Sequence, residues 1–438
     1  MSTSPTPQPH DTNSKALAVN LEASVYGTFA EIGAGQEVAR WFLSVGAASG
    51  TVAQAISAYD KTVSDDTYGS GTRYVSKERL LAMLDHEYTL LVHRLSKDRG
   101  AQTRFFVFAD TIATRNYQGT NQQHGWLGLR FQVEPGEQPS QILLHINLRD
   151  SHAELQQQAI GILGVNLIYA AYHQRASSAE FLAGLFEGLA HERIDFDVLE
   201  LSGPAFAAVD SRLWCLDLLA RGMSDAIVFD GNAQTVEPSA PLRKRPMIVH
   251  RSMYEYPGLF GGDAIQAAQK QFLSEGKAFQ REPIVVIQVS IRNPGHADFD
   301  CATMLASVKR FAPLGTVVVT EFHEGYRLVD YLRRHTSEPI RMIMGIAGLV
   351  GLMQANAYKA TPGALLESFG RLLTTDVTLY VGSMPMETFV AALSDMPSGF
   401  VVESAASASM TLDDFTPKPP IDHLFRYLRG AGRMVPLE

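Results

Sequence analysis

One short passage of the sequence places acidic, basic and amide side chains directly after an apolar, strand-like run. The run RFFVFADTIA contains Asp110 near its end, and Arg115, Asn116, Asn121 and His124 follow it. An arginine can bind a phosphate or carboxylate through two hydrogen bonds, and an aspartate or histidine beside that anion can act as a general base. We predict Asp110 and His124 as catalytic residues and Arg115, Asn116 and Asn121 as substrate-binding residues. The alternative is a hydrogen-bonded turn that holds neighbouring strands together.

A second polar group follows the strand-like run VLELSG. Ser202 and Gly203 end this run, and Asp210 and Arg212 lie at the start of the next predicted helix. Ligands of open α/β sheets bind beyond the carboxyl ends of strands. We therefore predict that these four residues also bind substrate, with a purely structural strand-to-helix turn as the alternative.

Two glycines precede a run with helical spacing. Gly33 and Gly35 lie just ahead of Val38, where a dinucleotide-binding fingerprint would have its third glycine. A glycine turn before a helix can bring backbone N–H groups close to a phosphate. Gly33 and Gly35 are therefore predicted to bind a cofactor, and the alternative is that they only allow a tight start to the helix.

Carboxylates gather in two further places. Three aspartates lie within residues 60–66, and His323 lies beside Glu321 and Glu324. Carboxylate oxygens are ligands of Mg²⁺, so Mg²⁺ is the one cofactor that the sequence suggests. An ordinary acidic surface loop has the same composition, and the sequence identifies no metal ligand.

The elements that must position these residues change in character along the chain. Residues 21–63 are rich in Ala and Gly with helical spacing, and an amphipathic helix is predicted from Ser76 to Arg94 with Ser76 as its N-cap. Three short strand-like runs between residues 103 and 148 predict an antiparallel meander. From Ile194 onward, strand-like runs alternate with helical ones, which predicts βαβ units and a parallel sheet.

The fold class is therefore mixed α/β. We predict a disordered tail over residues 1–20, a mixed α+β domain over 21–235 with helices and antiparallel strands, and a Rossmann-like α/β domain over 245–438 with a mostly parallel sheet. The polar, proline-bearing stretch 232–245 is the expected boundary.

Composition excludes several classes of protein. The chain has 46% apolar and 19% charged residues and a net charge of −9, which argues against general disorder and against a nucleic-acid partner. It has no apolar run long enough to span a membrane and no secretory signal, so we expect no membrane partner and a cytoplasmic location. Cys215 and Cys301 fit a reducing compartment. Small-residue stretches such as GAASGTVAQAISA, read as helices, predict close contacts and a homo-oligomer.

Four stretches resemble a family of cytosolic bacterial proteins of similar length. They are EIGAGQEVARWF, GTVAQAISAYD, TRNYQGTNQQHGWLGLRFQ and LSGPAFAAVDSRL. Members often carry the label nicotinate-nucleotide adenylyltransferase, and some carry the label TonB-dependent receptor. The first label implies nucleotidyl transfer and a His-x-Gly-His motif, of which this chain has only Asn293-Pro294-Gly295-His296. The receptor label implies a secreted membrane protein and is rejected.

Two functions follow as hypotheses. The first is a cytosolic enzyme that acts on a nucleotide-like or phosphorylated metabolite, a small anionic ligand held by Arg115 and Arg212. The second is a self-assembling scaffold or regulatory protein without enzymatic activity, because the sequence contains no complete catalytic signature.

Overall fold

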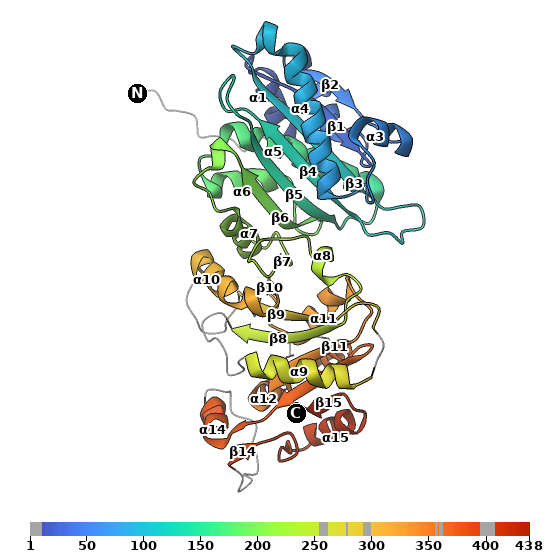
Figure 1. Ribbon diagram of the computed structural model, residues 1–438, viewed down its shortest axis with the longest axis vertical. Helices are drawn as coiled ribbons and strands as arrows, with labels where there is room; N and C mark the ends of the chain where they lie inside the picture. The colour runs from blue at the N-terminus through green and yellow to red at the C-terminus, as the bar shows by residue number, and fades with distance from the viewer. Residues whose placement is uncertain are drawn as a thin grey trace. The chain divides into compact units, whose positions relative to one another are not determined.

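The computed structural model in Figure 1 describes residues 11–253, 262–276, 279–291, 299–354, 358, 362–394 and 408–438. The chain divides into two compact units, Met1–Asp225 and Ala226–Glu438, each with its own principal sheet. The division precedes the polar stretch 232–245 because β7 (Ala226–Phe229) pairs with β10 (Thr316–Thr320) of the second unit.

The first unit is a six-stranded sheet with helices on both faces. Its strand order is β2-β1-β3-β4-β5-β6. The strands are β1 (Val25–Ile32), β2 (Val52–Ile56), β3 (Arg104–Ala113), β4 (His124–Phe131), β5 (Ser140–Leu148) and β6 (Ile194–Ser202). The helices are α1 (Thr12–Asn20), α2 (Glu37–Ser44), α3 (Lys61–Tyr68), α4 (Lys77–Arg99), α5 (Ala153–His173), α6 (Ser178–Phe186) and α7 (Ser211–Ala220), with the 3₁₀ turns η1 (Ala48–Gly50) and η2 (Pro204–Phe206).

The predicted meander is confirmed and extended. Strands β3, β4, β5 and β6 pair antiparallel, whereas β1 and β2 add a parallel part beside β3. The helix predicted at 76–94 is α4, and Ser76 is its N-cap, with its hydroxyl accepting the Arg79 N–H at 3.2 Å.

The helical prediction for residues 21–63 is wrong over two strands. Strand β1 is buried on both faces, so it lacks the alternation of a half-exposed strand. The stretch 46–58, read as a small-residue helix, contains η1 and β2 instead. The helix contacts expected from this stretch are therefore absent.

Residues 12–20 are not a disordered tail, because they form α1 and dock on the unit. The Asp11 carboxylate caps the helix by accepting the Ser14 N–H at 2.7 Å. The buried Lys15 ammonium lies 2.8 Å from both the Asn166 amide oxygen and a Glu187 carboxylate oxygen. These contacts fix α1 against α5 and the turn after α6.

The two faces of this sheet have different helical covers. Helix α4 lies across one face, where Leu80 and Leu84 pack with Val107 and Trp126 (Figure 1). On the other face, Phe106 lies edge-on to Tyr172 of α5, with 6.4 Å between ring centroids. Successive strand residues point to opposite faces, so each polar side chain on β3 and β4 points either toward the α4 face or toward the α5 face.

The second unit is built around a seven-stranded sheet with the order β15-β12-β11-β8-β9-β10-β7. Besides β7 and β10, its strands are β8 (Met247–Met253), β9 (Ile284–Ser290), β11 (Ile340–Gly345), β12 (Val377–Gly382), β13 (Met384–Pro385), β14 (Ser409–Met410) and β15 (Met434–Pro436). The helices are α8 (Ser239–Leu242), α9 (Gly262–Ser274), α10 (Cys301–Phe311), α11 (Gly325–Arg333), α12 (Ile346–Leu352), α13 (Ala364–Leu372), α14 (Met386–Ser394) and α15 (Ile421–Gly430), with the 3₁₀ turn η3 (Ala312–Leu314).

The mixed α/β class and the mostly parallel second sheet are confirmed. Strands β8 to β12 and β15 pair in parallel, and β7 is the antiparallel edge. The chain proceeds from β8 through β9 to β10 and then continues at β11 on the other side of β8. This reversal is the doubly wound arrangement of Rossmann-like sheets. In the part of the chain that the structure describes, no helix has the length and apolar character needed to cross a membrane.

Candidate functional site

Asp110 lies opposite Glu31 where the parallel strands β1 and β3 approach their carboxyl ends. Both side chains are buried, with exposed fractions of 0% and 1%. The two Glu31 oxygens accept the N–H groups of Val38 and Ala39 at 3.0 and 2.9 Å, near the start of α2. Asp110 Oδ1 accepts the Ile32 N–H at 3.1 Å, and Oδ2 is buried with no hydrogen-bond partner among the described residues.

The surroundings place the negative charge of this pair on Glu31. Burial raises the pKa of Glu31 to about 7, and the hydrogen bonds from Ala39 and Val38 oppose that rise. Burial, followed by the charge of Glu31, raises the pKa of Asp110 well above its ordinary value. Two adjacent buried carboxyls disfavour double ionisation, so Asp110 keeps a proton while Glu31 binds the helix N–H groups.

The glycine turn makes a tight connection from β1 to α2. Gly33 has a φ of +101°, and a Cβ there would lie 1.9 Å from the Ile112 carbonyl oxygen. Gly35 has a φ of +77°. Because Glu31 already takes the N–H groups of residues 38 and 39, the donors expected to hold a phosphate are occupied. This geometry favours the structural alternative for both glycines.

His124 lies on the other side of the sheet from Asp110. His124 is opposite Ala113 in the register, three residues beyond Asp110, so the two side chains point to opposite faces. The sheet therefore separates the two residues predicted as catalytic, so Asp110 and His124 do not share one site.

His124 instead starts a chain of hydrogen bonds that leads across three strands to the buried His145 and Asp197. Its Nδ1 lies 2.9 Å from His145 Nε2, and His145 Nδ1 lies 2.5 Å from Asp197 Oδ1. The His145 ring packs against Trp126 in a tilted arrangement, with 4.9 Å between centroids and 51° between the ring planes. Burial raises the pKa of Asp197, and His145 acts in the opposite direction. His145 and Asp197 belong to other strands, which the sequence alone did not bring together.

The loop between β3 and β4 is the hydrogen-bonded turn given above as the alternative. Asn121 Oδ1 accepts the Asn116 N–H at 2.9 Å, and its amide donates to the Thr114 carbonyl at 2.8 Å. Arg115 is exposed, and its backbone N–H donates to Gln156 Oε1 at 2.8 Å. Asn116 and Asn121 thus shape the turn, and the Arg115 guanidinium lies against Gly119 of the same turn.

The predicted residues after β6 do not join this group. Ser202 is on β6, separated from β3 by β4 and β5, which is about 14 Å across the sheet at roughly 4.8 Å per strand. Gly203 has a φ of +91° and lies close to the Ser140 backbone. Asp210 caps α7 and binds both Arg212 Nε and Nη2, at 2.8 and 2.7 Å. The Arg212 guanidinium therefore already has a carboxylate partner.

Two of the three aspartates within residues 60–66 have partners in the fold. Asp60 caps α3 by accepting the Thr62 and Val63 N–H groups at 2.9 and 3.1 Å. Asp65 binds Arg79 at 3.0 Å and the Tyr74 hydroxyl. These bonds explain the two carboxylates without Mg²⁺.

One group in the first unit has the spacing of metal ligands, namely His191, Asp195 and Asp225. Arg149 Nη2 lies 2.5 Å from Asp225 Oδ2 and 3.3 Å from Asp195 Oδ2. Burial alone would raise the pKa of Asp195, but the His191 hydrogen bond and the Arg149 charge lower it. The Arg149 guanidinium thus supplies the positive charge at this position.

The second unit contains a candidate site that no sequence motif indicated. Strand β8 is where the strand order reverses, and ligands of such sheets bind beyond the carboxyl ends of the strands at that point. Arg251 is near the carboxyl end of β8. Its Nε donates to Gln288 Oε1 of β9 at 2.9 Å, and Gln288 Nε2 donates to the Thr320 hydroxyl of β10 at 2.9 Å. Three neighbouring strands thus position the guanidinium.

Arg251 also lies against the turn between β10 and α11. Its Nη2 donates to the His323 carbonyl at 2.7 Å, and Nη1 lies close to Gly325, the first residue of α11. Among the described residues, no carboxylate comes within ion-pair distance of Arg251. Burial lowers the pKa of this guanidinium, while the charges of Tyr358 and Glu324 favour its charged form.

The metal hypothesis for residues 321–324 gains no geometric support. Arg327 lies 3.6 Å from a Glu321 oxygen and 4.0 Å from a Glu324 oxygen. His323 is exposed, and the described part of the chain contains no metal-ligand group made of these three residues.

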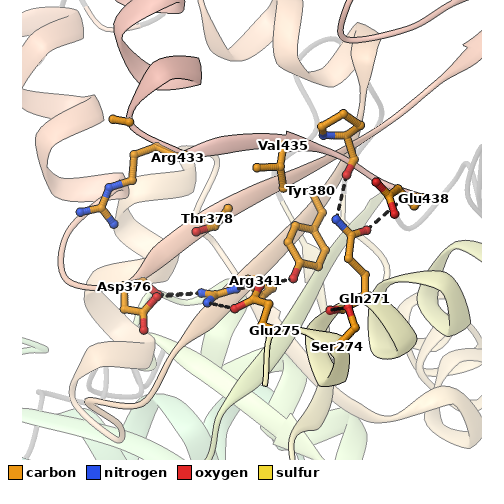
Figure 2. A pocket seen from close by; sticks show the side chains of 13 residues that line it. Gln271, Ser274, Glu275, Arg341, Asp376, Thr378, Tyr380, Arg433, Val435 and Glu438 are labelled. Atoms are coloured by element: carbon orange, nitrogen blue, oxygen red, sulfur yellow. Dashed lines mark hydrogen bonds and ion pairs between the residues drawn. The ribbon is translucent and has the colours of Figure 1, made fainter. Parts of the chain in front are cut away.

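A separate groove of about 720 Å³ lies beside the edge strand β15. Figure 2 shows Arg341 on its floor between Asp376 and Glu275. Arg341 Nε and Nη2 bind Glu275 at 2.7 and 2.5 Å, Nη1 binds Asp376 at 3.1 Å, and the Tyr380 hydroxyl donates to Glu275. The two carboxylates thus occupy the Arg341 guanidinium and leave a net negative charge at the floor of the groove.

Comparison with known proteins gives partial structural likeness only. No family model matches the sequence, and no curated protein matches it. The competence/damage-inducible protein CihA from Agrobacterium tumefaciens is 17% identical, with 39% of this chain and 98% of that chain covered and a TM-score of 0.27. A competence-damaged protein (CinA) superfamily protein from Enterobacter cloacae is 9% identical, with 39% and 98% covered and a TM-score of 0.29. Both matches thus cover nearly all of the solved protein but less than half of this chain.

Proposed function

We propose that the protein binds a phosphorylated or nucleotide-like small molecule as its substrate, at the carboxyl edge of the seven-stranded sheet. The observation that carries this proposal is Arg251, a guanidinium positioned by β9 and by the β10–α11 turn, with no carboxylate at ion-pair distance among the described residues. A guanidinium held in this way is suited to bind an anion through paired hydrogen bonds.

The place of Arg251 in the fold supports the same conclusion. The carboxyl ends of parallel strands next to a reversal of strand order form the usual ligand crevice of doubly wound sheets. The first N–H groups of α11, which begins at Gly325, have no partners within the helix and favour an anion. We therefore propose Arg251 as the anion-binding residue, in place of Arg115 and Arg212, which the sequence suggested.

The predictions of a specific reaction, a cellular location and an oligomeric state are part of this proposal. Nucleotidyl transfer rests on the family resemblance, and its partial motif at residues 293–296 lies outside the described residues. A cytoplasmic location and a homo-oligomeric state likewise stay predictions.

Isothermal titration of the full chain with inorganic phosphate and with AMP tests the proposal. Both ligands are expected to bind, and Arg251→Gln is expected to weaken binding by about 10-fold or more, since hydrogen bonds to charged groups contribute roughly 1.5–3 kcal/mol. Arg310→Gln, an exposed arginine at the end of α10, is the matched control and should leave affinity unchanged. Absence of binding by the unsubstituted chain, or equal binding by the Arg251 variant, would contradict the proposal.

A further inference from the structure

Glu324 provides an unused hydrogen-bond acceptor next to Arg251. It is the residue before α11, yet its side chain does not cap the helix. Its Oε2 is buried and accepts no hydrogen bond from the described residues, and its ion pair with Arg327 Nη1 is long, at 4.0 Å. A buried acceptor without a donor is uncommon in folded proteins, and the Glu324 side chain is 31% exposed, so a donor from outside the chain can reach it.

The Arg251 guanidinium contacts the backbone on both sides of Glu324. Arg251 donates to the carbonyl of His323, the residue before Glu324, and lies close to Gly325, the residue after it. The two side chains are near enough for the charge of Glu324 to influence Arg251, but they form no ion pair within 4.0 Å. A bound molecule can therefore contact both groups at once.

The chemistry of these two groups restricts the ligand. A carboxylate accepts hydrogen bonds and repels a phosphate. Glu324 therefore favours a phosphate-bearing molecule only if that molecule also has a hydrogen-bond donor next to its phosphate. An ammonium group would be a third cation beside Arg251 and Arg327, whereas a hydroxyl adds no charge. The neighbouring donor is therefore best supplied by an alcohol.

Resting on the proposed function, we infer that the ligand is a phosphate ester with a hydroxyl group close to its phosphate, as in a sugar phosphate or the ribose of a nucleotide. Arg251 binds the phosphate, and Glu324 accepts the hydrogen bond of the hydroxyl. Glu324 is in this way the residue that distinguishes such esters from simple alkyl phosphates.

Two ligands that differ only in their hydroxyls test this inference, namely glycerol 3-phosphate and propyl phosphate, titrated into the full chain. Glycerol 3-phosphate is expected to bind about 10- to 100-fold more tightly, which corresponds to one hydrogen bond to a charged group. Glu324→Ala should abolish this preference and leave propyl phosphate bound at least as tightly, which also shows that the variant is folded. Glu338→Ala, at the opposite end of the parallel strands, should keep the preference.

The possible failures are distinct. Equal affinity of the unsubstituted chain for both esters would overturn the role of Glu324 and leave the phosphate site at Arg251 standing. A preference for glycerol 3-phosphate that persists in Glu324→Ala would also overturn that role. If neither ester binds, the proposed function fails together with this inference.

Discussion

Glu31 and Asp110 face each other across the parallel strands β1 and β3, and both carboxyls are buried in the same layer of the first unit. Glu31 receives two N–H groups of α2, whereas Asp110 receives one and keeps an oxygen without a partner. The pair is therefore asymmetric, with the charge on Glu31 and the proton on Asp110.

The first prediction concerns the pH dependence of stability. The pKa of Glu31 is about 7 in the folded chain against an ordinary value of 4.5, so between these values the folded state binds more protons than the unfolded state. The stabilising contribution of this group is complete below pH 4.5 and is lost as the pH rises to 7. The expected loss is about 3 kcal/mol, at about 1.4 kcal/mol per pKa unit.

Denaturant unfolding of Glu31→Gln and of the unsubstituted chain between pH 4.5 and 8 measures this contribution. The difference in unfolding free energy between the two proteins should change across that window, because Gln does not titrate. Glu154→Gln, an exposed glutamate in the first turn of α5, should show no such change. A difference that is constant with pH would show that Glu31 titrates normally.

The second prediction concerns the proton on Asp110. Asp110→Asn should change stability at pH 7 by less than about 1 kcal/mol, since the carboxyl is already neutral and the amide oxygen can still accept the Ile32 N–H. Asp110→Ala should cost about 1–3 kcal/mol, because it leaves that buried N–H without an acceptor. A large loss in the Asn variant would mean that Asp110 is ionised in the folded chain. Equilibrium unfolding at pH 7 provides both values.

The third prediction separates backbone strain from steric contact at two glycines. Gly33 and Gly46 have similar φ values, +101° and +89°, but only at Gly33 would a Cβ meet backbone, 1.9 Å from the Ile112 carbonyl oxygen. Gly46→Ala is expected to cost about 1 kcal/mol, and Gly33→Ala more than about 3 kcal/mol. Thermal or denaturant unfolding compares them. Equal costs would mean that the turn shifts to accommodate the methyl group.

The fourth prediction compares two arginines of the second unit. Arg341 is 2% exposed and is bound by Glu275 and Asp376, whereas Arg371 is 44% exposed and is bound by Asp330. Arg341→Ala should cost about 2–3 kcal/mol, somewhat below the loss for a fully buried pair because Asp376 and Glu275 retain contact with water. Arg371→Ala should cost about 0–1 kcal/mol. The denaturation midpoints of the two variants show which substitution destabilises the protein more. A larger loss of stability in Arg371→Ala than in Arg341→Ala would contradict the prediction.

The sequence by itself determined the local elements and their order. Alternating apolar runs predicted β3, β4 and β5, Ser76 marked the start of α4, and the strand–helix alternation after residue 194 indicated the parallel sheet. These features depend on side chains close together in the sequence, so periodicity and capping are sufficient to predict them. Strand β1 was missed because a strand buried on both faces lacks that alternation.

Only the tertiary structure decided which side chains meet. The sequence identified Asp110 and His124, but the register of β3 with β4 puts them on opposite faces, and the register of β3 with β1 gives Asp110 the partner Glu31. Arg251 meets the turn at residue 323 because β8 and β10 flank β9 in the sheet. Register and strand order are set by long-range packing, and a shift of one residue moves every side chain of a strand to the other face, so a site shared between strands cannot be read from the sequence alone.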